Sequence, residues 1–130
     1  MEFKGKVALV TGSARGIGRA IAEGLARRGA DVVIADVNLD EARATSEEIA
    51  GLGVKTSAVR LDVSKAEEVA KTFEGIMQSF GRLDILVNNA GITRDSLLLR
   101  MKEEDWDAVM QVNLKGVFLC SKEAVKIISW

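Results

Sequence analysis

The chain has 130 residues, which predicts a single domain over 1–130, and its 18 Lys and Arg against 19 Asp and Glu leave a net charge of -1. That balance provides no basic surface for nucleic acid, and no apolar stretch approaches the roughly 18 residues of a membrane span. With no histidine and one cysteine, the chain cannot form a Ser-His-Asp relay, an imidazole metal site or an internal disulfide. We therefore expect a cytoplasmic protein without a metal, a nucleic-acid partner or a membrane partner.

Apolar runs alternate with segments of helical period along the chain. Short aliphatic runs predict strands, at 7–10, 31–37, 56–62 and 84–88. Apolar residues that recur every three or four positions predict helices, from Ile17 to a stop at Gly29, at 39–50, from Ser64 to about Phe80, at 97–101, and from Glu103 nearly to Ile128. Capping boxes are predicted for two of them, by Asn38 with Glu41 and by Ser64 with Glu67.

Strand and helix alternate four times in succession. This order predicts an α/β fold with a doubly wound parallel sheet, helices on both faces and right-handed crossovers. Ligands of such sheets bind outside the carboxyl ends of the strands. We therefore look for the chemistry in the segments that follow the predicted strands.

A glycine-rich segment follows the first predicted strand and leads directly into a helix: Thr11-Gly12-Ser13-Ala14-Arg15-Gly16-Ile17-Gly18. Glycines at this spacing allow a tight turn, a close approach to a diphosphate, and close packing of helix on strand. The helix amino terminus adds free N–H groups and a positive dipole end. A glycine turn without a ligand is the alternative, but the position between strand and helix favours a ligand. The candidate cofactor-binding residues here are Gly12, Ser13, Arg15, Gly16, Ile17 and Gly18.

Asp36 closes the second predicted strand. Its carboxylate can accept both hydroxyls of an adenosine ribose and would repel a 2'-phosphate. The alternative, a cap for the next helix, is a role that Asn38 already fills. Asp36 therefore favours NAD(H), whereas Arg15 in the glycine segment could reach a 2'-phosphate and keeps NADP(H) possible.

Short polar residues end the third and fourth predicted strands. Asp62-Val63 and Asn88-Asn89-Ala90-Gly91 should face the same crevice, where they suit an adenine edge and a close approach to a ribose. Each group alone is also consistent with ordinary turns. Because both lie at one edge of the sheet, we include the following as candidate cofactor-binding residues: Asp62, Val63, Asn89, Ala90 and Gly91.

Asn113 lies on one face of the last predicted helix with Trp106, Met110 and Val117. A buried amide needs hydrogen-bond partners. Asn113 could bond back to a helical carbonyl and kink the helix, or it could form a polar post that holds a water at the mouth of the crevice. We keep both hypotheses.

Together these motifs resemble the short-chain dehydrogenase/reductase family, in register from Lys4 to about Lys126. The segment 88–95, with Met101-Lys102 and Asp105-Trp106, is similar to its bacterial 3-oxoacyl-acyl-carrier-protein reductases, followed by acetoacetyl-CoA reductases. The resemblance implies a Rossmann-like sheet in the order 3-2-1-4 and hydride transfer from a nicotinamide to a 3-oxoacyl thioester. It also implies that Asn89 and Gly91 contact the cofactor, and that Asn113 is the catalytic asparagine of the family's Asn-Ser-Tyr-Lys set.

The chain departs from the family in its catalytic residues. The resemblance places Ser, Tyr and Lys on a fifth strand and its following helix, which these 130 residues do not reach, and the chain contains no tyrosine. We therefore expect an N-terminal dinucleotide-binding fragment that is inactive alone. The alternative is a nonenzymatic nucleotide-binding or self-associating scaffold; a methyltransferase is disfavoured by the glycine spacing.

Self-association is a further expectation. The strand residues Ile85-Leu86-Val87 should form an exposed sheet edge, which tends to pair with other chains. The last helix should present Trp106, Met110, Val117 and Val125 toward a sheet that lacks a strand. The resemblance likewise implies that this helix takes part in a homo-oligomer interface.

Overall fold

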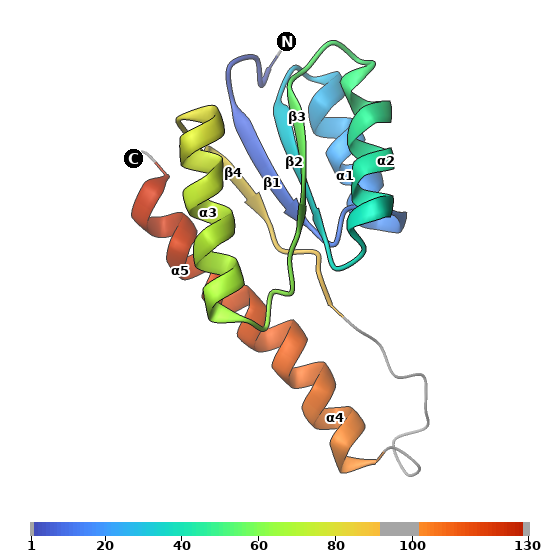
Figure 1. Ribbon diagram of the computed structural model, residues 1–130, viewed down its shortest axis with the longest axis vertical. Helices are drawn as coiled ribbons and strands as arrows, with labels where there is room; N and C mark the ends of the chain where they lie inside the picture. The colour runs from blue at the N-terminus through green and yellow to red at the C-terminus, as the bar shows by residue number, and fades with distance from the viewer. Residues whose placement is uncertain (1, 92–101, 129–130) are drawn as a thin grey trace.

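The computed structural model describes residues 2–91 and 102–128, and its centre is a parallel sheet (Figure 1). The strands are β1 (Val7–Thr11), β2 (Asp31–Asp36), β3 (Thr56–Arg60) and β4 (Ile85–Val87). They lie in the order β3-β2-β1-β4. The predicted doubly wound sheet and its order 3-2-1-4 are therefore confirmed. The third strand ends at Arg60, two residues earlier than predicted.

Helices cover both faces of the sheet. They are α1 (Gly16–Arg27), α2 (Leu39–Ala50), α3 (Ala66–Phe80), α4 (Glu103–Met110) and α5 (Gly116–Ile127), with a π-helical turn, η2 (Gln111–Lys115), between the last two. In Figure 1, α1 and α2 lie on one side of the sheet and α3 and α5 on the other. The helix predicted at 97–101 lies outside the described residues.

The alternation of side chains along the central strands explains why both faces are covered. In β1, Val7 and Leu9 belong to the core beneath α3 and α5, whereas Ala8 and Val10 belong to the core beneath α1 and α2. All five β1 residues are buried, which accounts for the uninterrupted apolar run in the sequence. The central strands therefore lie buried between the two helix layers. Because the strands are parallel, their carboxyl ends lie together at one edge of the sheet.

The predicted capping boxes have different outcomes. Asn38 caps α2 through its Oδ1, which accepts the N–H of Glu41 at 3.1 Å. The prediction for Ser64 is wrong, because α3 begins at Ala66 with Lys65 as its N-cap residue. The Ser64 hydroxyl instead donates to Asp62 Oδ1 at 2.6 Å. A nearer carboxylate, two residues back, competes successfully for this hydroxyl.

The last helix differs from the prediction in two respects. It is not continuous, since η2 interrupts it around Asn113. Three of the four apolar residues predicted to face the sheet are exposed, Trp106 at 53%, Val117 and Val125, whereas Met110 is half-buried. The fully buried residues of α5 are small and allow the helix to pack closely on the layer below: Gly116, Cys120 and Ala124. Leu119 and Ile127 pack against the same core but are only partly buried.

β4 is an edge strand, as expected, and its three side chains are half-buried. In Figure 1, α4 extends away from the sheet, and none of its described side chains is buried. Within 2–91 and 102–128, the helices lack the combination of length and apolarity that crossing a membrane requires. The cytoplasmic location stays a prediction.

Candidate functional site

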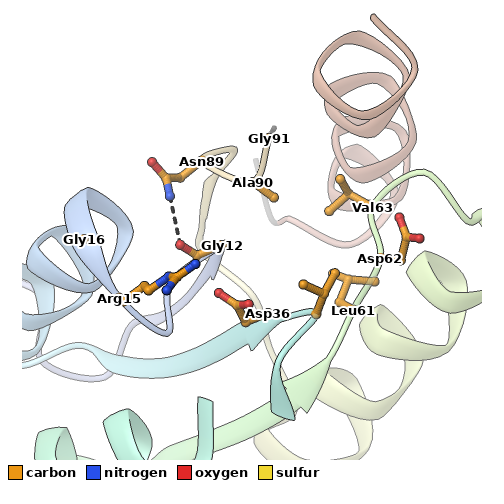
Figure 2. Close-up of a pocket in the computed structure, with 11 residues that line it drawn as sticks. Gly12, Arg15, Gly16, Asp36, Leu61, Asp62, Val63, Asn89, Ala90 and Gly91 are labelled. Atoms are coloured by element: carbon orange, nitrogen blue, oxygen red, sulfur yellow. Dashed lines mark hydrogen bonds between the residues drawn. The ribbon is translucent and has the colours of Figure 1, made fainter. Parts of the chain in front are cut away.

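A pocket of about 460 Å³ lies at the carboxyl ends of the strands (Figure 2). The segments after all four strands contribute to it. Its lining residues are Gly12, Arg15 and Gly16 after β1, Asp36 and Val37 at β2, Leu61, Asp62 and Val63 after β3, and Asn89, Ala90 and Gly91 after β4. The motifs singled out in the sequence, up to 79 residues apart, thus surround one cavity.

Among the candidate cofactor-binding residues, Ser13, Ile17 and Gly18 do not line this pocket. Ser13 is fully buried, with its hydroxyl donating to the Val10 carbonyl at 2.6 Å and accepting the Ala35 N–H at 3.2 Å. Ser13 therefore joins the ends of β1 and β2. Ile17 is largely exposed in the first turn of α1. Its role toward a cofactor stays a prediction.

Glycine is required at two positions of the loop for steric reasons. Gly12 has φ +63°, and a Cβ added there would lie 2.8 Å from Ala90 Cα. A Cβ on the buried Gly18 would overlap the carbonyl oxygen of Gly12. The first glycine lets the β1 end pass beside the β4 end, and the last lets α1 begin directly against the loop.

Residues of β2 and α2 form hydrogen bonds with the backbone of the glycine loop. The Ala14 N–H donates to Asp36 Oδ2 at 3.1 Å, and the Ala14 carbonyl accepts the Thr45 hydroxyl at 2.5 Å. Thr45 is buried in the middle of α2. Sequence reasoning missed it because nothing in a helical threonine indicates a partner 31 residues away.

Thr11, another residue missed as a site residue, connects β1 to the β4 end. Its buried Oγ1 accepts the N–H groups of Asn89 at 3.0 Å and Ala90 at 2.9 Å, and donates to the Val87 carbonyl at 3.4 Å. The available signal was its place as the first residue of the glycine motif. Asn89 adds a bond in the same region, from its Nδ2 to the Gly12 carbonyl at 2.9 Å (Figure 2).

Asp36 holds the loop and faces the pocket at the same time. Besides Ala14, its carboxylate accepts the Asn38 N–H through Oδ1 at 3.1 Å. A carboxylate has about four lone-pair positions, so acceptor capacity remains for a ligand. Figure 2 shows Arg15 on the same side of the pocket as Asp36, and Arg15 is the one cationic residue among those labelled.

Asp62 presents a second carboxylate at the β3 end. The Ser64 hydroxyl holds the pKa of this carboxyl below its usual value, with help from the Ser64 N–H and the nearby Lys65 and Arg60, whereas burial acts in the opposite direction. Both Ser64 donors bind Oδ1. The group is therefore an ionised acceptor at neutral pH.

Val37 and Leu61 line the pocket but were missed by sequence reasoning. Val37 is 61% exposed beside Asp36, whereas Leu61 is buried. In the sequence, only their positions next to Asp36 and Asp62 indicate that they belong to the site. In the described residues, no three acidic or cysteine side chains are grouped as a metal site would require.

Asn113 does not line the pocket but lies next to Gly91, which does. A Cβ added to Gly91 would lie 2.5 Å from Asn113 Oδ1, so the amide packs against a lining residue. Asn113 is half-buried within η2, where the helix is irregular. This distortion is consistent with the hypothesis that the Asn113 side chain bonds back to a helical carbonyl and kinks the helix. The water-holding role stays a prediction.

Comparisons with known proteins agree with this arrangement. The sequence model described as short chain dehydrogenase matches residues 6–129. The protein named 3-oxoacyl-[acyl-carrier-protein] reductase FabG is 48% identical in Thermotoga maritima over 91% of this chain and 48% of the relative. The protein of the same name in Aquifex aeolicus is 49% identical over 97% of this chain and 51% of the relative. The one in Escherichia coli K12 is 48% identical over 97% of this chain and 50% of the relative.

The chain thus spans about half the length of the curated relatives it matches. The family match covers both the glycine loop and the η2 segment, so it includes every element that surrounds the pocket. The chain belongs to the short chain dehydrogenase family.

Proposed function

We propose that this chain is the dinucleotide-binding part of a 3-oxoacyl thioester reductase. The observation that carries the proposal is the pocket built from all four strand ends around a loop in which Gly12 leaves no room for a side chain. A diphosphate fits over Gly12 and Gly16, because α1 begins at Gly16 and its dipole favours an anion at that end. The N-cap residue Arg15 makes no side-chain hydrogen bond to the first N–H groups of α1 in the described structure.

The remaining lining residues fit the adenosine half of such a cofactor. Asp36 has acceptor capacity for two ribose hydroxyls, and Asp62 and Val63 lie one strand further, where a base would follow. Val37 and Leu61 add apolar surface for a planar ring. Asp36 supports a preference for NAD(H), and Arg15 offers the charge that NADP(H) would need.

A bound nicotinamide would supply a hydride for a 3-keto group. The substrate class is taken from the name of the relatives, 3-oxoacyl-[acyl-carrier-protein] reductase. Asn113 would act as a positioning residue behind Gly91. Because these 130 residues contain no tyrosine, no phenol is available to give the proton that the family resemblance requires. We therefore propose that this polypeptide alone binds the cofactor without turning over a ketone.

Calorimetry on the 130-residue polypeptide tests the proposal. NADH and ADP should both bind, with most of the affinity retained in ADP, and Gly12→Ala should abolish binding of both. Gly24→Ala is the matched control, since an added Cβ there meets nothing within 4 Å. Absence of NADH and NADPH binding to the folded protein would refute the cofactor role and favour a scaffold. Turnover of acetoacetyl-CoA would refute the proposed inactivity.

We also propose that the chain self-associates through the exposed apolar face of α5. Val117, Phe118 and Val125 are exposed on this helix, and together with Ser121, Lys122 and Lys126 they form one largely apolar surface. Contiguous apolar surface of this kind marks an interaction site. The β4 edge is the other candidate surface.

A further inference from the structure

We propose that Gly116, at the start of α5, determines the position of Val63 and thereby the fit of the base end of the pocket. This inference rests on the proposed dinucleotide binding. Gly116 itself does not line the pocket; Val63 does. Gly116 therefore brings the start of α5 into contact with a residue that lines the pocket.

Gly116 and Val63 are packed without spare room. A Cβ on Gly116 would overlap Val63 Cγ2 and would lie 3.0 Å from Val63 Cβ. Both residues are buried. Rotation of the valine methyls would leave the Cβ contact in place, and a β-branched side chain has few alternative rotamers. A methyl group at position 116 must therefore displace the backbone or the whole side chain of Val63.

The surroundings determine the direction of that displacement. α5 is anchored by Cys120 and Ala124, which are buried against the core beneath α3 and α5. Close-packed cores resist such shifts. On its other side Val63 borders the open pocket of about 460 Å³, and Figure 2 shows it on the same wall as Leu61 and Asp62. The side with free volume is the pocket, so Val63 would move into it.

The β3–α3 turn links this movement to the polar group beside it. Ser64 binds Asp62 Oδ1 through both its N–H and its hydroxyl, and the Lys65 N–H donates to the Asp62 carbonyl at 3.0 Å. Val63 lies between these bonded residues. Its displacement changes both the apolar wall and the position of the Asp62 carboxylate, the two features that a base would contact.

The experiment compares two dinucleotides that differ only in the base, NAD⁺ and nicotinamide hypoxanthine dinucleotide. Gly116→Ala should weaken NAD⁺ binding by about tenfold, the effect of one misplaced methyl group in a binding pocket, and should change the ratio of the two dissociation constants. A merely structural role would weaken both dinucleotides by the same factor. Gly75→Ala, in α3, is the matched control, because its Cβ meets nothing within 4 Å.

A second substitution supplies the rescue. Val63→Ala removes the overlap with Cγ2 but keeps the Cβ contact, so the double variant should fold more stably than Gly116→Ala and recover part of the NAD⁺ affinity. If Gly116→Ala does not fold, Val63→Ala alone must alter the base ratio. An unchanged ratio in that variant, or in a folded Gly116→Ala, overturns this inference alone. Failure of the unsubstituted chain to bind either dinucleotide overturns the proposed function and this inference with it.

Discussion

Replacing Thr11 by valine should loosen the β4 end of the pocket without changing the shape of the core. Thr11 is buried, and its hydroxyl oxygen accepts the N–H groups of Asn89 and Ala90. Leaving a buried donor without a partner costs about 1–3 kcal/mol. These two groups are only partly buried, so water can replace some of the loss, and we expect a decrease of about 2 kcal/mol in the free energy of unfolding.

Urea unfolding measures this directly. With a slope of about 2 kcal/mol per molar, the midpoint should fall by about 1 M. Thr11→Ser is the control, because it keeps the oxygen and removes one methyl group, a change worth about 0.8 kcal/mol before any cavity cost. The valine variant should also bind NADH more weakly. A valine variant at least as stable as the serine variant would show that the hydroxyl does not hold this loop.

Three further predictions concern charge and surface. Asp36→Asn should raise the affinity for NADPH relative to NADH by about tenfold, measured by calorimetry, because it removes a charge that would repel a 2'-phosphate; an unchanged ratio would contradict the ribose assignment. Arg82 holds the pKa of Asp84 below its ordinary value of 3.8, so this carboxylate stabilises the fold above that pH and the contribution is lost as the pH falls through the lower, folded value. Asp84→Asn should therefore flatten the acid side of the stability profile, and an unaltered slope would count against it. Phe118→Lys should shift the chain toward monomer in light scattering; a wild-type monomer at micromolar concentration would remove the basis for self-association.

The predictable parts of the fold depended on short-range patterns. The β1 run is apolar at every position because alternate residues enter different cores, and this burial leaves a clear signature. The glycine loop was recognisable because steric limits at Gly12 and Gly18 permit no other residue without strain. The positive φ of Gly12 and the contact of Gly18 with the Gly12 carbonyl both lie within the loop, so the sequence displays these constraints.

The missed features depend on partners distant in sequence. Thr45 looks like an ordinary helical residue until α2 is placed against the Ala14 carbonyl. Ser13 was included with the ligand-binding loop, but the direction of its side chain depends on where β2 lies. The prediction for the last helix was wrong because it placed Val117 and Val125 toward the sheet, whereas the fully buried residues of α5 are Gly116, Cys120 and Ala124. Their small side chains let the helix approach the layer below closely.

The bonds around Ala14 bear on how slowly its amide exchanges with solvent. The N–H groups of Ser13 and Ala14 already donate to the Ala35 carbonyl and to Asp36. Both should be protected from deuterium before any nucleotide arrives, and nucleotide should add little protection. We therefore expect the entropy of ordering this turn to be lost during folding rather than when a nucleotide binds.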